Sequence, residues 1–319
     1  MVSKFTTNVT GLIAPHIGNF AAMQSTVSRP FHLLAIAVLA LTWGSSFILM
    51  KNAMHDEMGK PVLAPEQVAA LRMGIASLLL LPVSIRAFRK IKVSEWKYLA
   101  VVGLMGSGIP AVLFTTAQQH LDSSLAGILN TLTPLFTLLI GVIFFRKEFK
   151  RMQLLGILIG LSGAISLIVL NKTGSSANPL FAALIILATL LYGISVNTIS
   201  SKMPHIHPLH ITALSLLLAG IPWSIYLAQT DFTDILANHH HGWTSVGYVA
   251  VLAIFGTCLA NMLYFWLTQQ TSPLFASSVT YLMPMVAVGW GIEDGEPLTA
   301  IHLLCGLIIL AGVWLVNKK

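Results

Sequence analysis

Long apolar stretches, each bounded by charged residues, proline or glycine, recur along almost the whole chain. A membrane-spanning helix needs about 20 consecutive, mainly apolar residues, because its backbone polar groups must be hydrogen-bonded within the segment itself. The alternation of apolar and polar residues that marks membrane strands is not present. The pattern therefore predicts an all-α, polytopic membrane bundle of ten transmembrane helices, at residues 31–51, 66–88, 97–118, 123–145, 152–170, 179–200, 209–228, 244–267, 274–292 and 298–316.

The composition agrees with a bilayer as the main solvent. The chain is 55% hydrophobic and 9% charged, whereas soluble domains carry about 25% charged residues. The net charge of +7 could indicate a nucleic-acid partner. However, the basic residues lie in short runs between apolar segments, without interleaved aromatic residues. We expect membrane lipids and a small molecule as partners, and no nucleic acid.

The basic residues predict the orientation of the chain, because lysine and arginine stay preferentially on the cytoplasmic side during insertion. With both termini inside, the outer side holds Lys51, Lys60 and Lys172. The inner side then holds most of the 18 basic residues, namely Lys4, Arg29, Arg86, Arg89, Lys90, Lys92, Lys97, Arg146, Lys147, Lys150, Arg151, Lys202, Lys318 and Lys319. We therefore expect an integral protein of the plasma (inner) membrane with both termini cytoplasmic.

Residues 1–30 contain no continuous apolar core and do not resemble a cleaved secretory signal. We expect a disordered tail there, and Met23 is an alternative start of translation. Cys258 and Cys305 lie within apolar stretches and have no partners at metal-ligand spacing. We interpret them as small buried hydrophobic residues, interpret the 239–241 histidine run as a solvated loop, and expect neither a metal nor a cofactor.

The chain resembles itself at a displacement of about 150 residues, the kind of internal repeat that should be sought before any motif. Matching positions include Trp43-Gly44 with Tyr192-Gly193, Gly106 with Gly256, Ala126 with Ala276, and Pro134 with Pro284. The repeat divides the ten spans into five-helix units at 31–170 and 179–316. Because each unit has an odd number of spans, the second copy is predicted to be inverted. Two such units give nearly equivalent packings around a midplane site, as in alternating-access transporters.

Three stretches resemble the EamA type of the drug/metabolite transporter superfamily over residues 31–316. They are Leu41-Thr42-Trp43-Gly44-Ser45-Ser46-Phe47 with the later Arg72, residues 124–136 (SLAGILNTLTPLF), and Gly295-Glu296-Pro297-Leu298-Thr299 with the later Gly306 and Gly312. The acidic run at 293–296 departs from the single acid that usually follows glycine. The resemblance implies small-molecule transport, often export, and leaves the substrate open.

Polar side chains within spans should face the bundle interior, since an unpaired amide or hydroxyl is costly in hydrocarbon. Each could form interhelical hydrogen bonds or line a cavity. Trp43 and Tyr192, related by the repeat, are stronger cavity candidates, because interface anchoring does not explain aromatic residues at midplane depth. The predicted substrate-binding set is Trp43, Ser46, Arg72, Asn130, Thr133, Tyr192, Asn261 and Tyr281, with Asn197 and Thr280 as further polar residues.

Arg72 is the one Lys or Arg deep inside a predicted span, and an intramembrane charge is a functional hypothesis by default. Snorkelling or structural pairing, with Glu66 as a partner one and a half turns away, is the alternative to direct anion binding. Pro134 and Pro284 should kink matched helices and free a carbonyl in each. Those kinks either line the cavity or only fit the bundle.

All eleven Asp and Glu residues lie at span ends or in loops, so a carboxylate proton relay at the midplane is not predicted. Facilitated or exchange transport follows as the hypothesis, unless span-end acids such as Glu148 or Glu293, histidines or the substrate provide coupling. We expect an exporter of a small metabolite, such as an amino acid or a drug-like compound, and not an enzyme.

Two alternatives remain open, and a third, a scaffold or receptor, is not favoured because the loops and tails are short. A carrier of phosphorylated sugars or nucleotide conjugates would need several cavity cations. A membrane-embedded lipid-modifying enzyme would depend on His120 with Asp122, the one tight acid–base pair in the sequence. A scaffold or receptor would want a soluble signalling domain. A homodimer is a candidate assembly.

Overall fold

The computed structural model describes residues 29–148, 150–170, 179–296 and 298–317. Within these residues the elements are helices, and extended pairing is limited to one isolated bridge between His55 and Pro61. The predicted all-α class is therefore confirmed. The tail expected at residues 1–30 lies outside the described residues except for Arg29 and Pro30, which instead begin the first helix.

The elements of the first half are α2 (Arg29–Gly44), α3 (Ser46–Met54), α4 (Pro65–Leu79), α5 (Leu81–Phe88), η2 (Val93–Glu95), α6 (Trp96–Gly103), η3 (Leu104–Gly108), α7 (Ile109–Gln118), α8 (Ser123–Asn130), α9 (Thr133–Phe145) and α10 (Arg151–Leu170). Those of the second half are α11 (Pro179–Lys202), α12 (Pro208–Leu227), α13 (Phe232–Asn238), α14 (Gly242–Val251), η4 (Leu252–Leu259), α15 (Ala260–Gln270), α16 (Pro273–Ser277), η5 (Ser278–Tyr281), α17 (Met283–Glu293) and α18 (Ala300–Asn317).

Seven helical stretches among the described residues are long and apolar enough to cross a membrane. They are 30–54, 93–118, 123–145, 179–202, 208–227, 242–270 and 273–293. An eighth arises if α4 and α5, bent by 60°, form one span. Two shorter apolar helices, 151–167 and 300–316, occupy the remaining predicted positions. The protein is thus an integral membrane protein whose predicted spans are all helical.

The breaks within spans have local causes. Pro82 lies in the first turn of α5 and has no N–H to donate to the carbonyl four residues earlier. The helix therefore bends just before it, at Leu80 between α4 and α5. Pro110 similarly follows the π-helical segment η3. Segment η4, at the corresponding place in the second half, is also π-helical. Such π segments leave carbonyls free of the regular helical ladder.

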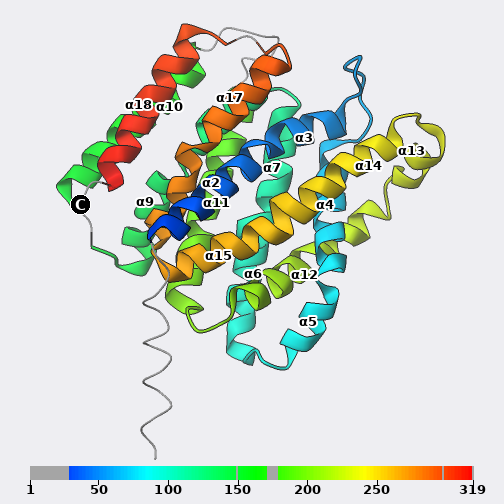
Figure 1. Ribbon diagram of the computed structural model, residues 1–319, viewed down its shortest axis with the longest axis horizontal. Helices are drawn as coiled ribbons and strands as arrows, with labels where there is room; N and C mark the ends of the chain where they lie inside the picture. Colours follow the sequence, from blue (N-terminus) through cyan, green and yellow to red (C-terminus); the bar gives the residue numbers. More distant parts are fainter. Residues whose placement is uncertain (1–28, 149, 171–178, 297, 318–319) are drawn as a thin grey trace, which may run out of the picture.

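The first helices of the two halves pack into the opposite half (Figure 1). Helices α2 and α3 contact α14, α15 and α17, while α11 contacts α6, α7, α8 and α9. The large core cluster contains buried residues from both halves, including Leu39, Leu129, Ile185 and Leu267. This reciprocal packing places the interface between the halves at the centre of the bundle.

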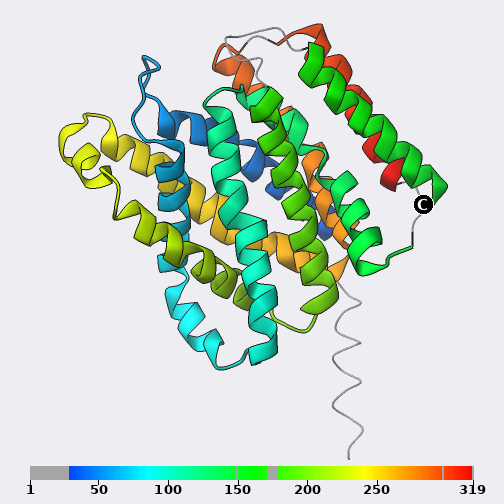
Figure 2. The ribbon, with the colours of Figure 1, turned by 180° about the vertical axis from the view of Figure 1, so that it is seen from behind.

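Helices α10 and α18 lie side by side along one edge of the bundle (Figures 1 and 2). Their contact uses backbone, because a side chain at Gly312 would meet backbone atoms of Gly156 and Gly160. Small residues permit this approach between membrane helices, where dispersion contacts replace the hydrophobic driving force. The glycine stripe of α10 therefore packs helices and lies away from the central interface.

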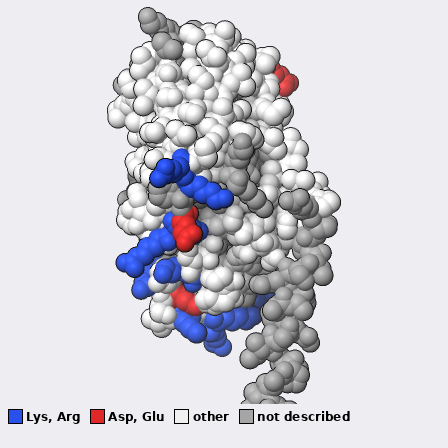
Figure 3. All heavy atoms as spheres, turned by 90° about the vertical axis from the view of Figure 1, so that its left-hand side faces the viewer, with Lys and Arg blue, Asp and Glu red and all other residues white. Residues whose placement is uncertain are grey.

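Charged side chains are unevenly distributed over the surface. On the face seen in Figure 3, lysine and arginine gather over the lower part, and the upper part is almost free of charge. Lys147 reaches inward, and its Nζ donates to the Asn197 side chain at 3.0 Å. Partial burial lowers the pKa of Lys147, which lies between α9 and α10.

Candidate functional site

A central cavity of about 90 Å³ lies between the halves. Its first-half lining comes from α2, α3, α4, η3, α7, α8 and α9, and its second-half lining from α11, α15, η5 and α17. The lining includes seven of the eight predicted substrate-binding residues: Trp43, Ser46, Arg72, Asn130, Thr133, Tyr192 and Asn261. The structure therefore brings together side chains that lie far apart in the sequence.

Trp43 and Arg72 converge on one carbonyl group in η4. The Trp43 indole donates from Nε1 to the carbonyl of Gly256 at 2.8 Å. Arg72 donates from Nη2 to the same carbonyl at 3.5 Å and from Nε to the Thr257 hydroxyl at 2.6 Å. The π-helical backbone of η4 thus orients an indole and a guanidinium that come from two different helices.

Arg72 does not pair with Glu66, the partner considered from sequence spacing. Its guanidinium extends across the interface to the second half, where the irregular helix offers acceptors. The two hydrogen bonds use only part of its planar donor fork. The cavity therefore retains guanidinium donors suited to a carboxylate or another anion.

Two aromatic pairs related by the repeat lie at the interface, and in each pair one ring comes from each half. Trp43 contacts Tyr264, with ring centroids 5.0 Å apart, and Phe114 contacts Tyr192, with centroids 6.1 Å apart. A displacement of about 150 residues relates Phe114 to Tyr264 as it relates Trp43 to Tyr192. Each pair joins one half to the other, so the aromatic lining follows the internal repeat.

Two serine–glycine contacts show the same reciprocity. A side chain at Gly256 would meet the Ser46 hydroxyl, and a side chain at Gly106 would meet the Ser195 hydroxyl. Ser46 and Ser195 belong to the first helices of their halves, whereas the glycines belong to the π segments of the opposite halves. At both positions the serine side chain lies so close to the glycine backbone that a Cβ atom there would force the serine to move.

The amides in the cavity make hydrogen bonds of ordinary or long distance. Asn261 donates from Nδ2 to the Ser107 hydroxyl at 3.1 Å. The Thr133 hydroxyl donates to the backbone carbonyl of Asn130 at 2.8 Å, while Asn130 Nδ2 contacts the Met283 sulfur at 3.5 Å. The weak sulfur acceptor leaves the Asn130 amide available to a ligand.

Tyr281 is placed apart from the rest of the predicted set. It does not line the cavity, and its hydroxyl donates to the Val313 carbonyl of α18 at 3.3 Å. Pro134 and Pro284 lie in the first turns of α9 and α17, directly after the breaks that follow α8 and η5. In the first turn of a helix, the backbone N–H groups have no acceptor within that helix, so a proline there removes no helical hydrogen bond.

Two cavity-lining residues, Phe114 and Tyr264, and the Arg72 partner Thr257 were not predicted from the sequence. Phe114 and Tyr264 could have been found by extending the repeat from Trp43 and Tyr192, because each occupies the matching place in its half. Thr257 carried no separate sequence signal. Of the further polar residues, Thr280 lines the cavity. Asn197 instead bonds to α9 through the Thr137 carbonyl.

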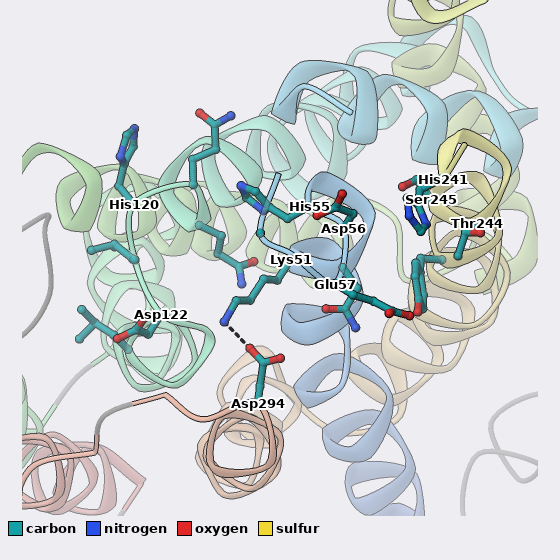
Figure 4. A pocket seen from close by; sticks show the side chains of 17 residues that line it. Lys51, His55, Asp56, Glu57, His120, Asp122, His241, Thr244, Ser245 and Asp294 are labelled. Atoms are coloured by element: carbon teal, nitrogen blue, oxygen red, sulfur yellow. Dashed lines mark hydrogen bonds and ion pairs between the residues drawn. The ribbon is translucent and has the colours of Figure 1, made fainter. Parts of the chain in front are cut away.

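A second and larger cavity, here called the vestibule, has a volume of about 690 Å³ (Figure 4). Its charged lining comprises Lys51, Asp56, Glu57, Asp122 and Asp294. Lys51 forms an ion pair with Asp294, drawn as the dashed line. Met50 lines the central cavity and the adjacent Lys51 lines the vestibule, so α3 borders both spaces.

Beside the vestibule, Glu296 binds the N-terminus of α8. Its carboxylate accepts from the backbone N–H of Ser123 at 2.8 Å and of Ser124 at 3.0 Å, and from the Ser124 hydroxyl at 2.7 Å. Burial alone would raise the pKa of Glu296, but these hydrogen bonds and nearby Lys51 together lower it. The ionised carboxylate thus connects the segment after α17 to α8.

The acid–base pair proposed for a lipid-modifying enzyme is not assembled. His120 stacks on Phe181, with ring centroids 3.9 Å apart, and Asp122 makes no hydrogen bond with it. Among the described residues, no group of three or more His, Cys, Asp or Glu side chains is arranged to hold a metal ion. Among the described residues, His120 and Asp122 are therefore not arranged as the pair that this enzyme would need.

Known proteins of similar sequence are named as transporters. The chain is 25% identical over 286 residues to an uncharacterized transporter of Archaeoglobus fulgidus, covering 88% of this chain and 98% of that one. It is 29% identical over 287 residues to the uncharacterized inner membrane transporter YedA of Escherichia coli K12, covering 88% of each. A solved crystal structure shares the fold, with a TM-score of 0.60 and 15% identity over 91% of this chain and 97% of that chain.

The family model described as the EamA-like transporter family matches residues 30–169 and 180–318. The matched segments contain the central cavity, the vestibule and both π-helical segments. The resemblance found in the sequence is therefore confirmed, and this integral membrane protein belongs to the EamA-like transporter family.

Proposed function

We propose that the protein exports a small amphipathic metabolite, such as an amino acid or a drug-like compound, by alternating access between its two halves. The observation that carries this proposal is the central cavity, where the Arg72 guanidinium lies among aromatic rings contributed by both halves. Concave sites with a few placed polar groups and mainly apolar walls are typical of small-molecule binding.

The lining favours a ligand that combines an anionic group with an apolar body. Arg72 provides donors for a carboxylate, and the aromatic pairs provide apolar surface and negative ring faces for a cationic amine. A cavity of about 90 Å³ is small for such a ligand, since each water alone needs about 10–15 Å³ on this measure. Ligand binding would therefore require the halves to separate, as alternating access does.

Ten transmembrane helices in two inverted five-helix repeats are part of the proposal. Counting the bent pair as one span and adding the two shorter apolar helices gives ten. The reciprocal contacts of Ser46 with Gly256 and of Ser195 with Gly106 support a twofold relationship between the halves, since units related in this way contact each other through equivalent positions. With an odd number of spans in each half, the second half would then be inverted.

We further propose an inner-membrane location with both termini cytoplasmic, based on the excess of lysine and arginine in alternate loops. Single cysteines can test this orientation after Cys258 and Cys305, both buried, are replaced by alanine. A membrane-impermeant maleimide added to intact cells should label Glu57→Cys and Asp234→Cys and spare Lys90→Cys and Lys202→Cys until the membrane is opened. The reverse pattern would contradict the orientation.

The residues that line the central cavity include no Asp or Glu, which supports facilitated or exchange transport. If flux in proteoliposomes followed an imposed pH gradient and vanished without it, this part of the proposal would be wrong. Arg72 is the only lysine or arginine among the cavity-lining residues. A phosphorylated sugar or nucleotide conjugate, which favours several cations, is therefore the second candidate substrate. A homodimer remains a proposal for the assembly.

The first experiment is thermal stabilisation of purified protein by a panel of amino acids, nucleosides, sugars and cationic drugs, repeated with Trp43→Ala. A compound that stabilises the wild type and not the variant would identify the substrate class and place it in the cavity. Export of that compound by intact cells then tests direction. Equal stabilisation of both proteins would contradict the cavity assignment.

A further inference from the structure

Asp122 occupies the N-cap position of α8 but does not cap that helix. An aspartate at this position usually accepts a hydrogen bond from an N–H in the first turn. Here Glu296 takes the N–H groups of Ser123 and Ser124. The carboxylate of Asp122, half-buried in the vestibule wall, makes no hydrogen bond or ion pair with the rest of the described chain.

Gln118 provides a second acceptor in the same wall. Its side chain is 5% exposed, and Nε2 donates to the Phe47 carbonyl at 3.1 Å and faces the Ser123 hydroxyl at 3.3 Å. A backbone carbonyl can only accept, so this contact fixes which end of the amide carries the oxygen. The oxygen, Oε1, is buried and has no donor within the described residues.

The charge of the vestibule favours a cation. Asp56, Glu57, Asp122 and Asp294 line it together with a single lysine. That lysine, Lys51, is already paired with Asp294 and lies 3.4 Å from Glu296. A cleft lined by uncompensated charge of one sign concentrates ions of the opposite sign.

We propose that the vestibule holds a second ligand site, in which the Asp122 carboxylate and the Gln118 Oε1 atom accept hydrogen bonds from a primary ammonium group. Such a group carries positive charge and several N–H donors, and so satisfies both acceptors. A divalent metal ion fits less well, because the described residues form no cluster of three His, Cys, Asp or Glu ligands. During transport, this site would bind the amine of a substrate before or after it occupies the central cavity. That role rests on the proposed transport function.

Binding can be measured without transport, by calorimetric titration of the purified protein with butylammonium at constant ionic strength. We expect saturable binding by wild type and by Trp43→Ala, because Trp43 lines the central cavity and does not line the vestibule. Asp122→Asn should weaken binding by roughly tenfold or more, as expected when one partner of a charge-assisted hydrogen bond is removed. Gln118→Met should weaken it by a smaller factor.

Two controls distinguish hydrogen bonding to Asp122 and Gln118 from general electrostatic attraction of any cation to the vestibule. Glu57→Gln removes one charge from an exposed part of the same cavity and should change affinity by less than about twofold. Tetramethylammonium, which has no N–H donors, and sodium should not compete. The proposal is overturned if these ions compete equally, if Glu57→Gln weakens binding as much as Asp122→Asn, or if butylammonium does not saturate.

Loss of butylammonium binding in Trp43→Ala would place the amine in the central cavity and overturn the vestibule site, while leaving the proposed transport function intact. Conversely, failure of every compound to bind the central cavity would remove support for that function, yet saturable binding dependent on Asp122 would still establish the vestibule site. The unliganded melting temperature of Asp122→Asn, compared with wild type, shows that the variant is folded.

Discussion

The indole nitrogen of Trp43 donates a hydrogen bond to the backbone carbonyl of Gly256, and this 2.8 Å contact joins the first helix of one half to the π-helical segment of the other. It fixes the plane of an aromatic side chain in the central cavity. Because the carbonyl belongs to irregular helix, its position depends on both sequence and packing. The contact therefore couples the shape of the cavity to the interface between the halves.

Trp43→Phe should keep a ring in the cavity and lose this hydrogen bond. We expect the free energy of unfolding to fall by about 1 kcal/mol, and the affinity for a compound identified by the stabilisation panel to fall several-fold. Thermal unfolding and titration measure both effects. Trp243→Phe, at a position 69% exposed, is the control, and an equal effect there would contradict the prediction.

Thr257→Val should release the Arg72 guanidinium while preserving side-chain volume. The lost partner is the hydroxyl 2.6 Å from Nε, and hydrogen bonds to charged groups contribute about 1.5–3 kcal/mol. We expect an anionic ligand to bind about tenfold or more weakly, with little change for a neutral analogue. Thr268→Val, which removes a hydroxyl that bonds only within α15, should leave both affinities unchanged.

Glu296→Gln should destabilise the protein by about 1–3 kcal/mol at neutral pH, because it weakens the charge-assisted bonds to the N-terminus of α8. The folded-state pKa lies below the ordinary value of 4.5, so below that pH the unfolded chain binds more protons. The contribution of Glu296 is complete above pH 4.5 and is lost as the pH falls through the folded-state pKa.

Melting temperatures measured from pH 7 to pH 3 should therefore converge for wild type and Glu296→Gln at the acidic end. Glu293→Gln is the control, since Glu293 is exposed at the end of α17. A constant difference between wild type and Glu296→Gln at every pH would show that the ionised carboxylate is not responsible.

Asp122→Asn should stabilise the protein at neutral pH, the opposite sign to Glu296→Gln. Burial, and then the nearby Glu296 carboxylate, raise the pKa of Asp122 above its ordinary value of 3.8. The folded state therefore binds more protons above pH 3.8, and stability falls as the pH rises through the folded-state pKa. The gain should vanish below pH 3.8. A variant that is less stable than wild type at pH 7 would contradict this account.

Gly312→Ala should separate α10 from α18, because the new Cβ atom would meet the backbone at Gly156 and Gly160. Overpacking of this kind costs about 1–3 kcal/mol. Gly306→Ala on the same helix is the matched control, since its nearest neighbour, the Ile128 side chain, lies at 3.7 Å. Unfolding in detergent should show a lower melting temperature for the first variant only.

Much of this arrangement could be predicted from the sequence because hydrocarbon imposes few choices on a backbone. Length and hydropathy predict the spans, and the internal repeat predicts that Trp43 and Tyr192 line one cavity, as they do. The partner of Arg72 could not be predicted, because spacing along one helix favours Glu66, whereas the acceptor comes from a π-helical segment of the other half. The position of Tyr281 outside the cavity could not be predicted for a similar reason, because its acceptor is a backbone carbonyl of another helix, α18.

The first helix of each half packs against the opposite half, and this packing also constrains the order in which the protein folds during synthesis. Trp43 and Arg72 enter the membrane early in synthesis, yet Gly256 and Thr257, to which they bond, are translated much later. Until then the first half must hold a guanidinium in the bilayer without its native acceptors. Completion of the cavity is therefore a late step of assembly, and a nascent chain that stops after α10 contains no binding site.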